Sequence, residues 1–170
     1  MLDIQDLSIS FHKQPVLQHL SFHLDGHECI YIHGINGSGK STLFKLICDI
    51  IKPTSGTITK KNDLQIGALI ENPGFLENET LAYNLQFLAS LKNQYDSTYI
   101  ESLCQQFQLD LHSSMKLKNF SVGMRQKAGI IQAIMENQEL ILLDEPTRGL
   151  DQTSIHTFCQ LINQLHDKGH

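Results

Sequence analysis

The stretch Gly34-Ile35-Asn36-Gly37-Ser38-Gly39-Lys40-Ser41 decides what this chain can be. It has the pattern G-x-x-x-x-G-K-S of a phosphate-binding loop. Its glycines allow successive backbone N–H groups to point inward at phosphate oxygens. Lys40 adds a mobile positive charge for the β and γ phosphates, and the Ser41 hydroxyl is a ligand for Mg²⁺. The pattern therefore predicts a nucleotide site that uses Mg²⁺.

The residues on either side of this loop support the prediction. The continuously apolar run Cys29–Ile32 predicts a buried strand that is covered on both faces. After the loop, apolar residues recur at helical spacing up to the stop at Pro53, namely Leu43, Leu46, Ile47 and Ile50. A loop between a strand and a helix directs the positive end of the helix dipole at the phosphates. A simple glycine-rich turn is the alternative, and this context disfavours it.

A second motif lies near the C-terminal end of the chain. The apolar run Leu140–Leu143 predicts a buried strand, and it ends in Asp144-Glu145-Pro146. Placing carboxylates beside a buried strand is costly unless a cation or hydrogen bonds offset the charge. We expect Asp144 to hold Mg²⁺, directly or through water, and Glu145 to orient and deprotonate an attacking water. The alternative is a strand that ends in a solvated acidic turn.

The rest of the chain predicts an α/β protein. Alternating apolar residues indicate β structure in the first thirty residues and again in residues 63–71. Residues 73–136 lack strand patterns and are interpreted as a mainly helical insertion. The final helix begins after Asp151, which can cap it, and Gly169 can close it. We expect one domain over residues 1–170, with a core of residues 1–72 and 137–170 and a helical subdomain of about residues 73–136.

Composition excludes some functions. The 170 residues include 13 basic and 18 acidic side chains, a net charge of −5, which counts against nucleic-acid binding. A hydrophobic fraction of 41% is typical of a chain with a buried core. The four cysteines form no C-x-x-C unit, and this favours a reducing, intracellular setting.

Four motifs in order resemble those of an ABC-type ATPase, the nucleotide-binding part of an ABC transporter. They are a Walker A motif at Gly34–Thr42, a signature sequence at Phe120–Gln126, a Walker B motif at Leu140–Glu145 and a D-loop at Gly149–Asp151. The resemblance covers essentially the whole chain. It implies a P-loop NTPase core with an N-terminal antiparallel β subdomain and an inserted helical subdomain.

The resemblance also implies roles for individual residues. Phe11 would stack on adenine, and Glu145 would be catalytic. Asp144 and Ser41 would hold Mg²⁺, and Asp151 would belong to the D-loop. The expected contacts with ATP come from one loop, namely Gly34, Asn36, Gly37, Ser38, Gly39, Lys40, Ser41 and Thr42. The expected signature contacts with the ATP of a second subunit are Ser121, Gly123 and Met124.

Three positions depart from the commonest family pattern. The signature has Val122 and Met124 where glycine and glutamine are frequent, a form familiar in bacterial drug and peptide exporters. Glu71 stands where the family has the glutamine of the Q-loop, and Ile70–Phe75 resembles the ATPases of lantibiotic immunity exporters. The resemblance implies that Glu71 binds Mg²⁺ and repels Asp144 when the metal is absent.

A basic stretch precedes and enters the signature helix. Residues 113–127 contain four cations and no acid, namely Lys116, Lys118, Arg125 and Lys127. We interpret them as a docking surface for the phosphates of a second subunit's ATP; a solvated basic face is the alternative. By family analogy, two subunits pair head to tail with two ATP molecules between them.

The sequence therefore predicts the ATP-binding and ATP-hydrolysing subunit of an exporter of peptides or drug-like compounds. Its expected partners are a transmembrane permease and a second ATPase subunit, with no nucleic acid. We expect a cytoplasmic protein that is bound peripherally to the inner face of the cell membrane. Two alternatives are a soluble ABC ATPase of DNA maintenance or translation, and a regulatory protein that binds ATP without efficient hydrolysis. The first normally carries a long coiled-coil insertion or two cassettes, which this chain lacks.

The length leads to one further expectation. The chain stops at His170, where its last helix ends, whereas the family places a switch histidine at the end of the next strand. We expect a C-terminally truncated cassette that has a gap in the centre of its sheet. Such a chain alone is expected to bind nucleotide weakly and to hydrolyse it slowly.

Overall fold

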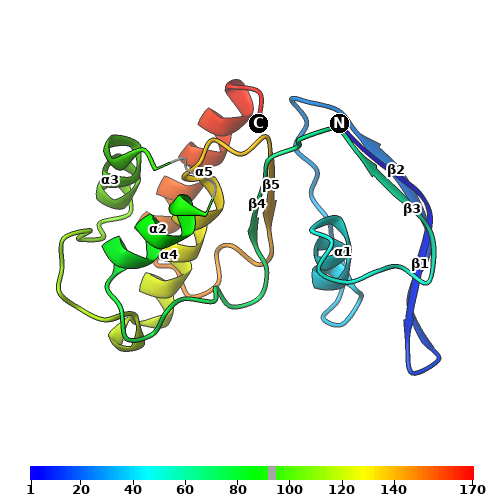
Figure 1. Ribbon diagram of the computed structural model, residues 1–170, viewed down its shortest axis with the longest axis horizontal. Helices are drawn as coiled ribbons and strands as arrows, with labels where there is room; N and C mark the ends of the chain where they lie inside the picture. The colour runs from blue at the N-terminus through cyan, green and yellow to red at the C-terminus, as the bar shows by residue number, and fades with distance from the viewer. Residues whose placement is uncertain (92–94) are drawn as a thin grey trace.

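The computed structural model describes residues 1–91 and 95–170, and these residues contain two β-sheets with helices between and beside them (Figure 1). The strands are β1 (Leu2–Phe11), β2 (Gln14–Leu24), β3 (Ser55–Lys60), β4 (Ile66–Leu69) and β5 (Leu140–Leu143). The helices are α1 (Lys40–Ile47), α2 (Leu81–Ser90), α3 (Ser97–Gln106), the 3-10 turn η1 (Leu117–Asn119), α4 (Val122–Ile134) and α5 (Gln152–Asp167).

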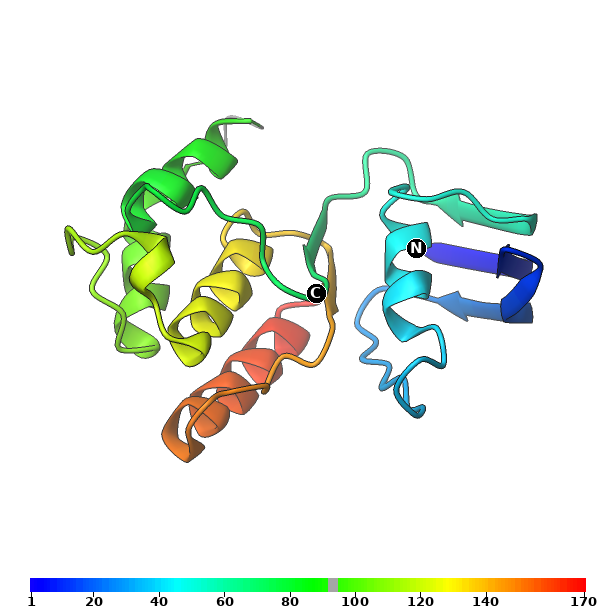
Figure 2. The same cartoon turned by 90° about the horizontal axis from the view of Figure 1, so that it is seen from below.

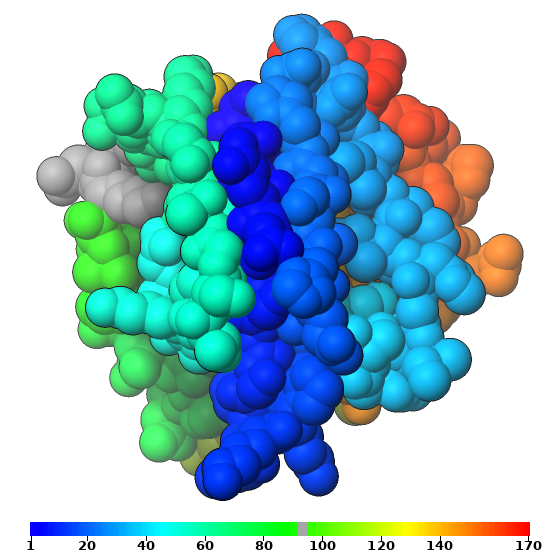
Figure 3. Space-filling model, turned by 90° about the vertical axis from the view of Figure 1, so that its right-hand side faces the viewer, coloured from blue at the N-terminus to red at the C-terminus, as the bar shows by residue number. Residues whose placement is uncertain are grey.

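The first sheet is antiparallel, with the order β2-β1-β3. It confirms the predicted N-terminal antiparallel β structure. Leu7 and Ile9 of β1 are buried as their alternation predicts, whereas Phe11 at the strand end is 46% exposed. Strand β3 was not anticipated, and it pairs with β1 from Leu2↔Lys60 onward. Figure 3 views the molecule from this side, with β1 at the surface between β2 and β3.

The second sheet consists of β4 and β5, which run parallel in register from Ile66↔Leu140 to Leu69↔Leu143. Both strands lie within the apolar segments that the sequence analysis predicted. Because they are parallel, their carboxyl ends meet at the same edge of the sheet. The residues that follow Leu69 and Leu143 are therefore neighbours, and the backbone N–H of Asp144 donates to the carbonyl of Leu69 at 2.8 Å.

The predicted buried strand at Cys29–Ile32 is wrong. These residues have no strand assignment, Ile30 is 50% exposed and Tyr31 is 85% exposed. An extended segment becomes a strand only when a neighbour pairs with its N–H and C=O groups. Among the described residues, β5 pairs with β4 alone and no strand pairs with Cys29–Ile32. The apolar pattern indicated a covered strand, but none of the described strands pairs with these residues.

Helix α1 lies between the two sheets, and the other four α-helices lie on the far side of β4 and β5 (Figures 1 and 2). Helix α1 contributes Leu43, Phe44, Leu46 and Ile47 to a core that it shares with both sheets. It ends at Ile47, earlier than the apolar spacing predicts, and Ile50 is 63% exposed. A second core joins α2, α3, α4 and α5.

Side-chain caps define where four helices begin. Thr80, Asp96, Ser121 and Asp151 each accept a hydrogen bond from the backbone N–H three residues later. The predicted cap of the last helix is thereby confirmed, since Asp151 Oδ1 accepts from Ser154 N at 2.8 Å. Gly169 ends this helix with φ +93°, as predicted. No helix in residues 1–91 and 95–170 is long and apolar enough to cross a membrane.

Candidate functional site

The loop before α1 depends on glycine at three positions. Gly37 and Gly39 have φ of +84° and +96°, which favour glycine over residues with a Cβ. A Cβ on Gly34 would overlap the Ser38 hydroxyl. A Cβ on Gly39 would lie 2.8 Å from Leu17 Cδ2, so the loop packs tightly against β2. The loop therefore has a defined shape that is anchored to the N-terminal hairpin.

The Lys40 side chain folds back over this loop. Its Nζ donates to the carbonyl oxygens of Gly34 at 2.8 Å and Ile35 at 3.1 Å. The backbone N–H of Ser38 also donates to the carbonyl of Ile35, at 3.1 Å. The ammonium therefore lies within the curve of the loop at the N-terminus of α1, beside backbone groups that the glycines leave accessible.

Ser41 and Asp144 meet at the end of the loop, although 103 residues separate them. The Ser41 hydroxyl donates to Asp144 Oδ2, which joins the first turn of α1 to the end of β5. Asp144 is only 8% exposed. The sequence analysis assigned both residues to Mg²⁺, and the structure brings their oxygen atoms together.

Glu71 follows β4 at the same edge of the sheet. Its backbone has φ +58°, and its Oε1 is 2.6 Å from Lys45 Nζ. Lys45 lies one helical turn after Ser41 on α1, so both side chains project from the same face of that helix. Helix α1 thus contacts the end of β5 through Ser41 and the end of β4 through Lys45.

The backbone around Glu145 is held by Gln126, whose role the sequence analysis missed. Gln126 Nε2 donates to the carbonyl oxygens of Glu145 and Pro146, each at 3.1 Å. Gln126 is only 6% exposed, and Glu145 has an exposed side chain with φ +45°. The sequence offered one indication of this role: Gln126 is a polar residue that lies one helical turn before Ile130, on the buried face of α4.

The signature segment packs directly on the D-loop. Ser121 Oγ caps α4 by accepting from Met124 N at 3.2 Å. A Cβ on Gly123 would lie 2.7 Å from the carbonyl oxygen of Gly149, and Gly149 itself has φ +72°. The backbone N–H of Ser154 and the Lys127 ammonium hold the pKa of Asp151 below its usual value. Lys127 Nζ is 3.7 Å from Asp151 Oδ2.

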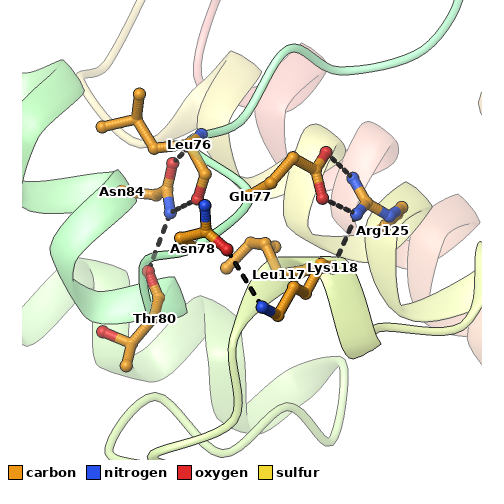
Figure 4. A network of polar contacts seen from close by, with 8 residues as sticks. All are labelled: Leu76, Glu77, Asn78, Thr80, Asn84, Leu117, Lys118 and Arg125. Carbon is orange, nitrogen blue, oxygen red and sulfur yellow. Dashed lines mark hydrogen bonds and ion pairs between the residues drawn. The ribbon is translucent and has the colours of Figure 1, made fainter.

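The four cations that we interpreted as a docking surface for phosphates all have partners within the chain. Arg125 donates to both carboxylate oxygens of Glu77 and to the carbonyl of Leu117, the last at 2.7 Å (Figure 4). Lys118 donates to Asn78 Oδ1 at 3.0 Å, and Lys116 is 3.9 Å from Glu79. Lys127 forms an ion pair with Asp151, so each of the four cations has a partner. Three of these four partners come from residues 77–79, which are distant in the sequence, so the basic stretch alone did not indicate them.

Asn84 fixes the segment that supplies those partners. It is 1% exposed, and its amide bonds the backbone N–H of Leu76 at 2.7 Å and the carbonyls of Leu76 and Thr80 at 3.2 and 2.9 Å (Figure 4). The backbone N–H of Lys118 donates to the carbonyl of Glu77 at 3.0 Å. Residues 76–80 and the segment before Ser121 are thus held against each other.

We expect the stability contributed by Glu77 to depend on pH. The hydrogen bond from Arg125 holds the pKa of Glu77 below its ordinary value of 4.5. Because the folded pKa is lowered, this stability is present above pH 4.5 and is lost as the pH falls through the lowered pKa. Glu77→Gln should therefore lower the thermal midpoint at pH 7, and the difference from wild type should shrink in acid.

Thermal unfolding of both proteins between pH 7 and pH 3 measures this difference. Glu79→Gln is the matched control, since its carboxylate is 3.9 Å from Lys116 and should matter less at pH 7. A difference for Glu77→Gln that stays constant across this range would contradict the prediction.

Comparisons with known proteins agree with this fold. Residues 17–148 match the family described as ABC transporter. The chain is 32% identical over 97% of its length to the uncharacterized ABC transporter ATP-binding protein YdbJ of Bacillus subtilis, of which it covers 57%. It is 30% identical over 99% of its length to the lantibiotic transport ATP-binding protein SrtF of Streptococcus pyogenes, of which it covers 76%.

A solved ATP-binding subunit of an ABC transporter has the same fold, with a TM-score of 0.88 and 30% identity. The match covers 99% of this chain and 76% of that one. This chain belongs to the ABC transporter family, and its fold is that of the ATP-binding cassette, a P-loop NTPase. The family resemblance is confirmed. The chain spans 57% of the length of the Bacillus relative.

Proposed function

We propose that this chain binds and hydrolyses ATP as the nucleotide-binding subunit of an ABC transporter. The observation that carries the proposal is the contact between Ser41 and Asp144 at the end of the glycine loop. A hydroxyl and a nearly buried carboxylate beside a phosphate-binding loop are the oxygen donors that Mg²⁺ requires next to a nucleotide. The donor set therefore fits Mg-ATP.

Each residue of the loop has a role in this proposal. Backbone N–H groups of Asn36–Thr42 bind phosphate oxygens at the N-terminus of α1. Lys40 exchanges its two carbonyl acceptors for the β and γ phosphates. Phe11 stacks on adenine; it lies on the hairpin against which Gly39 packs, near the β1–β2 pair Ile9↔Leu17.

Hydrolysis needs a positioned water. Bound Mg²⁺ would supply charge neutralisation at the phosphates. Glu145 follows Asp144 and projects an exposed carboxylate, so we assign it to orient and deprotonate the attacking water. Glu71 is assigned as a further metal ligand, because it follows β4 at the edge where Asp144 follows β5.

A second ATPase subunit completes the proposed site. Ser121, Gly123 and Met124 lie at the N-terminus of α4, where backbone N–H groups favour an anion. The nearby cations have partners within the chain, so we base this contact with the partner's ATP on the helix terminus. Asp151 follows Gly149, which packs on this same segment.

The proposed permease contact lies on the helical subdomain, which we assign to about residues 73–136. Tyr83 and Phe87 stack on α2 with ring centroids 6.5 Å apart, and they are 50% and 42% exposed. Leu76, in the loop before α2, is 44% exposed. An exposed apolar face of this kind suits a protein partner. Such a partner would hold the chain on the inner face of the membrane.

The proposed cargo class is a peptide or drug-like compound that is exported. It is supported by the Ser-x-Gly-Met signature, by Glu71, and by the likeness to a protein named for lantibiotic transport. The main alternative is a chain that binds ATP without efficient hydrolysis.

ATP-driven dimerisation tests the proposed function. Glu145→Gln should bind Mg-ATP and form a dimer, because the nucleotide is then retained between two subunits. Light scattering with and without saturating Mg-ATP measures the change in mass. Glu101→Gln on α3 is the matched control and should not retain a dimer. A Glu145→Gln chain that stays monomeric with bound ATP would refute the two-subunit site, and a chain that binds no ATP would refute the proposal itself.

A further inference from the structure

We propose that Lys45 is a built-in counter-charge for the metal-free site, and that it sets the Mg²⁺ concentration at which the site fills. Its ammonium holds Glu71 through the ion pair at 2.6 Å until a divalent cation replaces it. The inference rests on the proposed function and deepens it, because it adds a residue that regulates the same site.

The first argument is the charge at this edge of the sheet. Asp144 is hydrogen-bonded through its N–H to Leu69, two residues before Glu71, so two carboxylates face α1 from adjacent strand ends. Like charges held close together destabilise each other unless a cation lies between or beside them. Glu145 adds a third carboxylate next along the chain. A positive charge beside Glu71 therefore reduces the repulsion among these carboxylates when no metal is bound.

The second argument is which cation can supply that charge. The Lys40 ammonium is engaged by the carbonyls of Gly34 and Ile35, inside the loop. The Lys45 ammonium donates a hydrogen bond to Glu71 Oε1. Its place on α1, one turn beyond Ser41, directs it to the same strand ends as the metal-binding hydroxyl.

The third argument is that the pair can open. The Lys45 and Glu71 side chains are 32% and 58% exposed, so water can solvate either group when they separate. Exposed ion pairs are weak, whereas a divalent cation that also binds phosphate attracts the carboxylate more strongly. Glu71 is thus held in the metal-free chain but is not locked. A glutamine at position 71 would make no ion pair with Lys45. The proposed effect of Lys45 therefore depends on the carboxylate of Glu71.

A double-mutant cycle on the full chain tests the inference. Lys45→Gln should lower the Mg²⁺ concentration for half-maximal binding of fluorescent ATP about twofold to fivefold, the factor that an exposed ion pair represents. ATP affinity in EDTA should stay unchanged. Glu71→Gln should raise the Mg²⁺ requirement, and adding Lys45→Gln to it should have no further effect. Lys52→Gln, an exposed lysine beyond α1, is the charge-matched control.

The outcomes separate this inference from the proposed function. If Lys45→Gln leaves the Mg²⁺ requirement unchanged while wild type binds Mg-ATP, Lys45 is not a counter-charge and the proposed function stands. If the effect of Lys45→Gln persists in the Glu71→Gln background, the lysine acts by general repulsion of the metal, and the inference is overturned. If wild type binds no ATP, both proposals fail. A second readout is thermal stability in EDTA, which Lys45→Gln should lower and Mg-ATP should restore.

Discussion

Gly67→Ala should lower the free energy of unfolding by about 3 kcal/mol, because there is no room for a methyl group between β4 and α4. A Cβ at this position would overlap the carbonyl oxygen of Ala133 and lie 2.8 Å from its carbonyl carbon and 3.1 Å from Gln138 Cδ. Two of these three atoms belong to the backbone of α4, which cannot move without disturbing a packed core.

Urea unfolding followed by circular dichroism measures this loss. Gly26→Ala is the matched control, because nothing lies within 4 Å of a Cβ built there. Its effect should stay within about 0.5 kcal/mol. Equal stability of Gly67→Ala and wild type would mean that β4 and α4 do not pack as closely as described.

Lys40→Ala should weaken ATP binding about 100-fold. Removing one partner of a desolvated charge pair costs about 2–5 kcal/mol, and 100-fold corresponds to about 2.7 kcal/mol. The substitution removes the ammonium that lies within the glycine loop, where the phosphates would otherwise find their cation. The glycines and the N-terminus of α1 remain, so weak binding should persist.

Titration with fluorescent ATP in the presence of Mg²⁺ measures the affinity, and Lys52→Ala is the control with an exposed lysine removed. The thermal midpoint of Lys40→Ala without nucleotide should stay close to wild type, since its lost acceptors are two loop carbonyls that water can reach. Unchanged ATP affinity in Lys40→Ala would contradict the assignment of the loop to phosphate.

Local patterns predicted the parts of this protein that depend on local chemistry. The spacing of Gly34, Gly39 and Lys40 indicated a phosphate loop, since its shape requires glycine backbones and its charge comes from the next residue. The alternation of Leu7 and Ile9 predicted the hairpin face, and Asp151 predicted a helix start. The loop and the helix cap have partners within a few residues, and the hairpin strands are adjacent in the sequence, so local patterns contain most of these interactions.

Interactions between distant segments could not be predicted in this way. The cations near the signature were interpreted as a docking surface for phosphates, and their pairing with Glu77, Asn78 and Glu79 was not anticipated. Gln126 was indicated only as a polar residue on the buried face of α4, and its position did not show that it would hold the backbone of Glu145 and Pro146. The apolar run Cys29–Ile32 predicted a covered strand, and the outcome depended on whether another strand paired with it.

The sequence by itself thus determined the family and the glycine-rich loop, and it supplied the acidic residues of the proposed site, because these follow from residue type and spacing. Only the tertiary structure decided how they meet: Ser41 with Asp144, and Lys45 with Glu71. These contacts depend on parallel pairing of β4 and β5, which aligns their carboxyl ends beside one face of α1. Side-chain pairing across such distances is set by the packing of the elements, which no local pattern encodes.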